Sequence, residues 1–203
     1  MRPEDFEAVA VYSDLEFGGS FSSSDALVDR FFLNTLWSMK SNFVDVPTDC
    51  PQREKAGWTR DAQVFCRTAG YLADTKAFFR KWLHDVKDCQ GENGMVRNVA
   101  PRIFGEGSRM EGAEGSCGWI DAAVIIPYTL WNMTGDRAAI TQNLPLMLGF
   151  MDFVLSRCAD KSMFSLPEDN FMHAVYLSRH PLCRKGTDVL DARGAPGRGA
   201  PSL

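Results

Sequence analysis

Apolar residues recur at helical spacing through most of this chain, in segments that are separated by irregular loops. In residues 25–41 they return every three or four positions, from Leu27 to Met39, which predicts a helix that begins after Asp25. The same spacing predicts further helices over residues 60–72, 74–89, 119–133 and 136–158. No strand-like run lies between these segments. The sequence therefore favours an all-α fold of helical hairpins packed side by side over an alternating α/β fold.

The apolar positions also predict which helix faces are buried. The helices over residues 60–72 and 74–89 are each expected to bury one face, with these residues: Ala62, Val64, Phe65 and Ala69 in the first, and Ala77, Phe78, Trp82, Leu83 and Val86 in the second. The segment 119–133 is apolar on nearly all sides and contains Pro127, which predicts a buried, kinked helix. Pro145 is expected to divide the last helix, whose buried residues would be Ile140, Leu144, Leu148, Met151 and Leu155.

The two ends of the chain differ from the helical part. Residues 8–12 (AVAVY) are short and partly β-branched, which predicts a strand that needs partner strands from elsewhere. Residues 179–203 are rich in Arg, Gly and Pro and lack periodicity, which predicts a disordered tail. Between the predicted helices, residues 91–118 form a long glycine-rich loop, and such loops in compact domains are often functional.

Composition excludes several classes of function. The chain has 203 residues, a net charge of -4 and no basic stripe, which argues against nucleic acid as a partner. No apolar run approaches the about 18 residues of a transmembrane helix, so no membrane partner is expected. The six cysteines form no CxxC pair, so we expect no metal, and no other cofactor is expected. The first residues lack a basic-then-apolar signal peptide, so reduced thiols and a cytoplasmic location are expected.

The stretch of residues 47–61, PTDCPQREKAGWTRD, concentrates the chemically active side chains. Two prolines and a glycine keep it irregular, and it crowds carboxylates and basic groups around Trp58. Carboxylates can accept bonds from sugar hydroxyls or act as acids, arginine can hold them in place, and an indole can stack on a sugar ring. The stretch therefore predicts a sugar pocket, with a solvated surface turn as the alternative.

This stretch and three further segments closely resemble one known family. The stretch reads PTDCPQRE, then GW, then D followed by AQVF. SDLEFGGSFSSSD lies before it, FFRKWLHDVKDCQ lies after it, and GWIDAAVIIPYTLW lies further along. In this order they resemble the bacterial α-L-rhamnosidases of the family-78 glycoside hydrolases, over roughly residues 8–158.

The resemblance implies a fold and a domain organisation. The family has an (α/α)6 barrel, a ring of helical hairpins that follows a β-sandwich domain. Residues 1–18 would then be the end of the upstream β-sandwich domain, residues 19–178 the first part of the catalytic domain, and residues 179–203 an unmatched tail. The predicted helices make less than half of such a ring, so an incomplete six-hairpin barrel is expected.

The resemblance also implies a reaction, the inverting hydrolysis of terminal α-L-rhamnose from a glycoside or oligosaccharide, with Glu54 as general acid. Many relatives read RDERLGW where this chain has the shorter REKAGW, so Glu54 follows the shorter variant. Relatives often carry glycine at the position of Arg60, which places a bulky charge near the pocket. The resemblance implies substrate binding by Asp49, Arg53, Trp58, Asp61, Trp119 and Asp121.

The general base has no matching position in this chain. In the family it is a glutamate from the second half of the barrel, together with a histidine. The spacing of Glu168, His173 and His180 supports neither role, so the chain alone is expected to be inactive.

Other readings of the same residues stay open. The chain could be a non-catalytic carbohydrate-binding remnant, another (α/α)-barrel glycosidase such as an unsaturated glucuronyl hydrolase, or a helical interaction protein. Trp119 could equally be an ordinary core residue.

Overall fold

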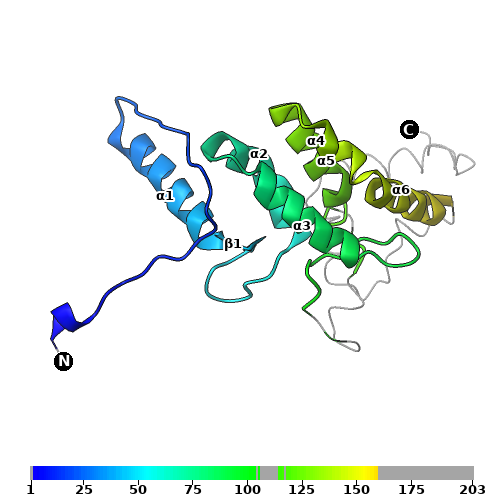
Figure 1. Ribbon diagram of the computed structural model, residues 1–203, viewed down its shortest axis with the longest axis horizontal. Coiled ribbons are helices and arrows are strands. Elements are labelled where there is room, and N and C mark those ends of the chain that lie inside the picture. The colour runs from blue at the N-terminus through cyan, green and yellow to red at the C-terminus, as the bar shows by residue number, and fades with distance from the viewer. Residues whose placement is uncertain (1, 104, 106–113, 117, 160–203) are drawn as a thin grey trace, which may run out of the picture.

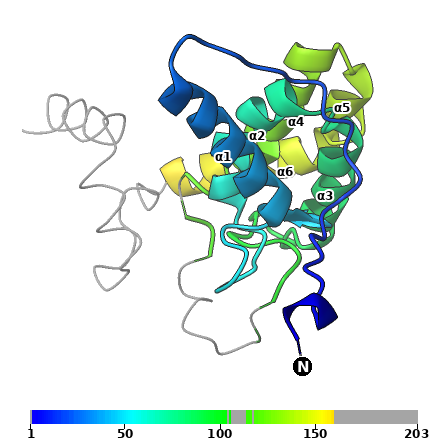
Figure 2. The same cartoon turned by 90° about the vertical axis from the view of Figure 1, so that its left-hand side faces the viewer.

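The chain forms a partial all-α fold whose helices lie side by side in a row (Figure 1). The computed structural model describes residues 2–103, 105, 114–116 and 118–159. Its helical elements are η1 (Pro3–Asp5), α1 (Ala26–Asn42), α2 (Thr59–Leu72), α3 (Lys76–Asp88), α4 (Ala122–Thr134), α5 (Arg137–Thr141) and α6 (Leu144–Ala159). In the turned view of Figure 2, α1 stands in front and α2, α4 and α6 follow behind it. The expected all-α architecture is confirmed.

Local sequence signals explain where the helices begin and end. The carboxylate of Asp25 caps α1 by accepting a hydrogen bond from the backbone N–H of Leu27 at 2.8 Å. Gly135, with a φ of 70°, ends α4 in the left-handed conformation that glycine adopts readily. The expected last helix is divided, as predicted, into α5 and α6. Pro145 is the second residue of α6, a position where the missing N–H costs no helical hydrogen bond.

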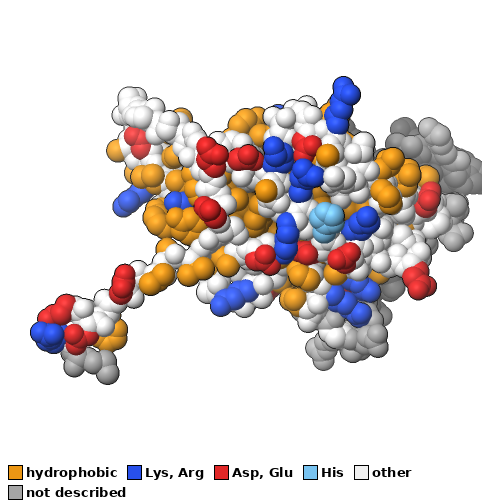
Figure 3. All heavy atoms as spheres, viewed as in Figure 1, with side chains coloured by type: hydrophobic (Ala, Val, Ile, Leu, Met, Phe, Trp, Pro, Cys, Tyr) orange, Lys and Arg blue, Asp and Glu red, His pale blue; other side chains and the backbone are white. Residues whose placement is uncertain are grey.

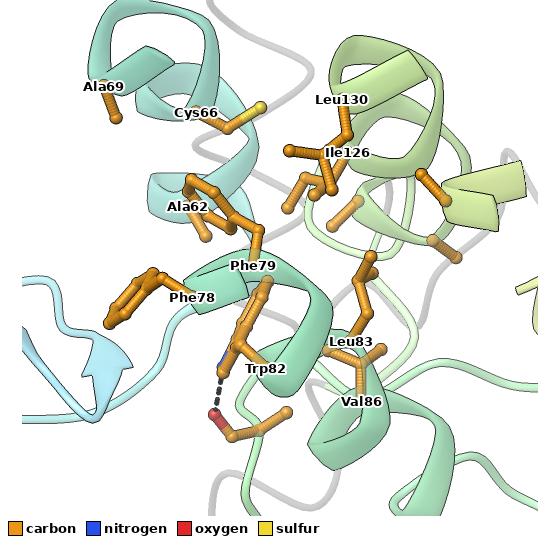
Figure 4. Close-up of a cluster of buried hydrophobic side chains, with 14 of the residues drawn as sticks. Ala62, Cys66, Ala69, Phe78, Phe79, Trp82, Leu83, Val86, Ile126 and Leu130 are labelled. Atoms are coloured by element: carbon orange, nitrogen blue, oxygen red, sulfur yellow. Dashed lines mark hydrogen bonds between the residues drawn. The ribbon is translucent and has the colours of Figure 1, made fainter. Parts of the chain in front are cut away.

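The core lies where α2 and α3 pack against α4 (Figure 4). Phe79, Trp82 and Leu83 of α3 are fully buried there. The indole N–H of Trp82 donates to the carbonyl of Ala100 at 2.8 Å, so this buried donor is satisfied and the loop after α3 is joined to the core. The predicted burial of Trp82 and Leu83 is correct.

The strand expected at residues 8–12 is not formed, because these residues have no neighbouring strand with which to share hydrogen bonds. The described residues contain instead a minimal antiparallel hairpin of β1 (Phe43–Val44) and β2 (Val46–Pro47). Asp45 closes this hairpin with a φ of 67°. Phe43 of the hairpin stacks on Phe78 of α3, with the ring centroids 4.5 Å apart.

Several residues that were expected to be buried are exposed. The prediction was wrong for Val64 and Ala77, for Ile125 and Trp131 of the segment that was expected to be buried on all sides, and for four residues of α6, namely Leu144, Leu148, Met151 and Leu155. The residues of α6 that are buried are Leu146, Phe150 and Phe153. Because α6 begins at residue 144 rather than 136, it presents a different stripe to the core, and it carries a second apolar stripe on the outside.

Apolar side chains are exposed at both ends of the helical row. In α1 the exposed residues are Leu27, Val28, Phe31, Leu33 and Trp37, and Figure 3 shows hydrophobic side chains gathered on the surface at this end of the molecule. The outer stripe of α6 lies at the opposite end of the row. Exposed apolar surfaces of this kind are typical of contacts with further protein.

The cysteines and the hydropathy of the helices add two findings. The thiols of Cys50, Cys66 and Cys89 are free, and burial raises the pKa of the Cys66 thiol to about 11. In the described part of the chain, no helix combines the length and the hydropathy that a membrane crossing requires. The predicted disordered tail of residues 179–203 lies outside the described residues.

Candidate active site

The stretch that was singled out in the sequence forms a closed loop. The backbone N–H of Asp49 donates to the carbonyl of Ala56 at 3.0 Å, and the N–H of Ala56 donates to Oδ1 of Asp49 at 3.1 Å. Inside this loop, the N–H of Glu54 donates to Sγ of Cys50 at 3.1 Å, and Lys55 has a φ of 52°. These bonds fix the backbone that carries Glu54.

The residues after this loop pair with a distant segment. The N–H of Thr59 donates to the carbonyl of Asn98 at 2.9 Å, and the N–H of Ala100 donates to the carbonyl of Gly57 at 2.9 Å. Trp58 and Val99 therefore face each other in an antiparallel bridge. This pairing places Trp58 at the N-terminal end of α2 and holds it against the segment that follows α3.

A polar network behind this pairing was not foreseen from the sequence. Glu114 Oε2 accepts a hydrogen bond from the backbone N–H of Asn98 at 2.8 Å, and the Asn98 side chain exchanges bonds of 3.2 and 3.1 Å with Ser116. Arg97 lies 3.7 Å from Glu114. The network joins the two ends of the glycine-rich loop, and its only sequence signal was a run of polar residues within that loop.

Five of the seven predicted site residues line one pocket of about 200 Å³: Asp49, Glu54, Trp58, Asp61 and Trp119. They come from the closed loop, from the paired segment, from the first turn of α2 and from the segment before α4. Arg53 is exposed on the loop and does not line the pocket. Asp121 does not line it either, and its Oδ2 accepts a hydrogen bond from the N–H of Gly118 at 3.1 Å.

The two tryptophans of the pocket are packed rather than loose. Trp58 and Trp119 are only 9% and 6% exposed, and they form a small apolar cluster with Ala56 and Val99. Trp119 is therefore both a core residue and a wall of the pocket. The guanidinium of Arg60 lies 5.1 Å from the centre of the Trp119 ring, a cation–π distance.

Glu54 and Trp58 are joined directly within the pocket. The indole Nε1–H of Trp58 donates to Oε2 of Glu54 at 2.8 Å. Among the described residues, Glu54 forms no ion pair with Lys55 or Arg53, which an ordinary surface turn would favour. A packed indole that points its donor at a carboxylate oxygen indicates an organised site rather than a solvated turn.

Asp61 is the pocket carboxyl whose ionisation is disfavoured. Desolvation by the surrounding protein raises the pKa of Asp61, although part of the residue reaches solvent. The negative charges of Asp49 and Glu54 raise this pKa further, while a backbone hydrogen bond and the charge of Arg60 oppose the rise. Burial therefore favours the neutral form of the Asp61 carboxyl.

Replacing Asp61 with asparagine is expected to raise the Tm at neutral pH. A carboxyl whose pKa is raised in the folded state stabilises the fold below its unfolded value of 3.8, and this contribution is lost as pH rises through the folded pKa. The Tm of Asp61→Asn minus that of the parent should therefore grow between about pH 4 and pH 7. Differential scanning fluorimetry over this range measures it, with exposed Asp152→Asn on α6 as the matched control. A difference that stays constant with pH would contradict the assignment.

A groove adjoins the pocket. It has a volume of about 360 Å³ and lies between α1 and α2, and Asp49 and Asp61 line both spaces. The groove is lined by Arg60 and by apolar residues that include Met39 and Phe65. The arrangement can hold one sugar ring against carboxylates and indoles, with room beside it for an attached group. Within the described residues, no group of three His, Cys, Asp or Glu side chains could hold a metal ion.

Comparison with known proteins identifies the family of this architecture. Residues 16–173 match the family model for the bacterial alpha-L-rhamnosidase 6 hairpin glycosidase domain. An α-L-rhamnosidase of Formosa agariphila is 37% identical over 142 residues, which are 70% of this chain and 15% of that protein. The chain thus spans about 15% of the length of this curated relative.

Solved structures agree with the sequence comparison. The Streptomyces avermitilis α-L-rhamnosidase complexed with L-rhamnose gives a TM-score of 0.67 at 32% identity, covering 72% of this chain and 14% of that chain. The native Aspergillus terreus enzyme gives a TM-score of 0.64 at 38% identity, covering 72% of this chain and 16% of that one. The resemblance seen in the sequence motifs is confirmed, and the chain belongs to the bacterial α-L-rhamnosidase six-hairpin glycosidase family.

Proposed function

We propose that this chain supplies the first part of the catalytic domain of an α-L-rhamnosidase that removes terminal α-L-rhamnose from rhamnosides by an inverting acid/base mechanism. The observation that carries the proposal is the convergence of three carboxylates and two indoles on one pocket of about 200 Å³. Carboxylates are strong acceptors for sugar hydroxyls, and indole faces stack on the apolar faces of sugar rings. Membership of the family supports the same substrate class.

Each pocket residue receives a proposed role. Glu54 protonates the glycosidic oxygen, so that the aglycone leaves as a neutral alcohol. Asp49 uses Oδ1 to hold the loop, which leaves Oδ2 to accept a bond from a sugar hydroxyl. Asp61 binds a second hydroxyl, and Trp58 and Trp119 form the walls of the sugar site. Arg53 and Asp121 stay as predicted substrate-binding residues, although neither lines the pocket.

The general base is proposed to lie outside these 203 residues, in the part of the relatives' length that the chain does not span. An inverting hydrolase needs a second carboxylate roughly 6.5 to 9.5 Å from the acid, with a water molecule between that carboxylate and the sugar. Glu168, His173 and His180, which the sequence left unassigned, fall outside the described residues. The relatives are much longer, and the apolar stripes of α1 and α6 are open for further hairpins. The chain alone is therefore expected to lack turnover.

A second candidate function is binding of rhamnose without hydrolysis. The pocket itself favours it equally, because carboxylates and indoles can hold a sugar without a base. The two functions differ only in what happens to the glycosidic bond after binding.

The test uses the chain and a chimera in which its residues 16–173 replace the matching segment of the Streptomyces avermitilis enzyme. Rhamnose binding is followed by tryptophan fluorescence, and hydrolysis by release of p-nitrophenol from its α-L-rhamnoside. We expect the chain to bind rhamnose without release, and the chimera to bind and to release. p-Nitrophenyl β-D-glucoside is the control substrate and should not be cleaved.

The outcomes separate the candidates. A folded chimera that binds rhamnose but releases nothing would favour the binding function. Absence of both binding and release in a folded chimera would overturn both candidates. Release by the chain alone would show that a base lies within its 203 residues and would contradict the proposed inactivity.

A further inference from the structure

Among the described residues, one side-chain donor holds the carboxylate of Glu54. Oε2 accepts the indole Nε1–H of Trp58 at 2.8 Å, and Oε1 accepts no hydrogen bond within the described residues. Glu54 itself is exposed on its turn. An exposed glutamate samples many rotamers, so a hydrogen bond from a fixed donor restricts the orientations of its carboxyl group.

Trp58 is suited to act as that fixed donor. Its ring is 9% exposed and packs against Ala56, Val99 and Trp119. Its backbone N–H donates to the carbonyl of Ala56 at 2.9 Å, and its neighbour Thr59 is bonded to Asn98. The indole is therefore held from both the ring and the backbone, and its N–H donates to Glu54.

We propose that Trp58 is the positioning residue of the acid, and that Oε1 of Glu54 is the oxygen that donates the proton. This inference rests on the proposed function. An indole nitrogen is a donor only, so the oxygen that it binds must act as an acceptor. The carbonyl oxygen of a neutral carboxylic acid is a stronger acceptor than its hydroxyl oxygen, so the proton is carried by Oε1, the oxygen that does not accept the indole N–H.

The same hydrogen bond also acts during proton transfer. The proton leaves Oε1 for the glycosidic oxygen, the bond between the sugar carbon and that oxygen breaks, and the aglycone departs as an alcohol. Water adds to the sugar carbon and gives its proton to the base. Glu54 becomes a carboxylate in this step, and its bond to the Trp58 N–H becomes charge-assisted and stronger. Trp58 thus has two effects: it orients the carboxyl group of Glu54 before the transfer, and it stabilises the Glu54 carboxylate that the transfer produces.

The first test needs no turnover and uses the whole chain. The indole N–H resonances are recorded by ¹H–¹⁵N NMR over a pH series, and Trp58→Phe identifies the resonance of Trp58. We expect the Trp58 resonance to follow one titration that disappears in Glu54→Gln. Trp82 is the internal control, because its N–H donates to the backbone carbonyl of Ala100, which does not titrate. A Trp58 resonance that ignores pH, or that still titrates in Glu54→Gln, would overturn the proposal.

The second test measures the role in catalysis, in the chimera. Trp58→Phe keeps an aromatic face and removes the N–H donor. We expect kcat to fall about tenfold more for methyl α-L-rhamnoside, whose leaving group needs a proton, than for 2,4-dinitrophenyl α-L-rhamnoside. Equal losses on the two substrates would show a merely structural role and overturn the inference. Failure of the parent chimera on both substrates would instead count against the proposed function, and the NMR result on the chain would be unaffected.

Discussion

Gly57→Ala is expected to lower the free energy of unfolding by about 2 to 4 kcal/mol and to abolish rhamnose binding. A Cβ at this position would lie 2.1 Å from the carbonyl oxygen of Ala100 and 3.1 Å from Nε1 of Trp82. The clashing oxygen belongs to the backbone, and it already accepts the hydrogen bond of Trp82. The chain can relieve the clash only by separating Gly57 from Ala100, which breaks their mutual pairing and moves Trp58.

Urea unfolding, followed by far-UV circular dichroism, measures this loss. Gly18→Ala is the matched control, because a Cβ on Gly18 meets no atom within 4 Å. The control should change the stability by less than about 0.5 kcal/mol. If Gly57→Ala unfolded at the same urea concentration as Gly18→Ala, the close approach of the two backbones would be refuted.

The helices of the first half were predictable because the helical spacing of their apolar residues indicates where they form. In α1 and α2 the apolar residues recur at helical spacing, and Asp25 caps α1 as the sequence indicated. Trp82 and Leu83 lie at the centre of the apolar face of α3 and are buried as expected. At Trp82 and Leu83 the local periodicity and the tertiary packing agree.

The orientation of α6 was not predictable in the same way. The helix carries two apolar stripes, one through Leu146 and Phe150 and one through Leu148 and Met151. Periodicity alone cannot tell which stripe faces the core of a partial ring, because both stripes are apolar at helical spacing. The break before α6 shifts the phase of the helix, and α4 then packs against the stripe that contains Leu146.

The members of the pocket could be predicted from the sequence, whereas their contacts could not. The charged loop identified Asp49, Glu54 and Asp61, which do lie together. The hydrogen bond between Trp58 and Glu54 depends on the left-handed backbone of Lys55 and on pairing with residues 98–100. Arg53 has the residue type that suits a sugar site, yet it is exposed and does not line the pocket.

Glu54→Gln is expected to lower kcat/KM for methyl α-L-rhamnoside by about a hundredfold to ten-thousandfold in the chimera. Glutamine keeps the size of the side chain and can still accept the indole N–H of Trp58, but it carries no acidic proton. A dinitrophenolate departs without protonation, so kcat/KM for 2,4-dinitrophenyl α-L-rhamnoside should fall by less than about tenfold. The ratio of the two losses measures acid catalysis separately from binding.

The controls distinguish Glu54 from Asp61 as the proton donor of the pocket. Glu92→Gln makes the same substitution at an exposed residue outside the pocket lining and should leave both substrates unaffected. Asp61→Asn tests the other carboxyl that can hold a proton, because its pKa is raised by desolvation. If Glu54 is the acid, Asp61→Asn should lower kcat/KM for both substrates by the same factor, because it removes a contact to the sugar. If the loss selective for methyl α-L-rhamnoside appears in Asp61→Asn and not in Glu54→Gln, Asp61 is the proton donor, and Trp58 then positions a carboxylate that only binds the sugar.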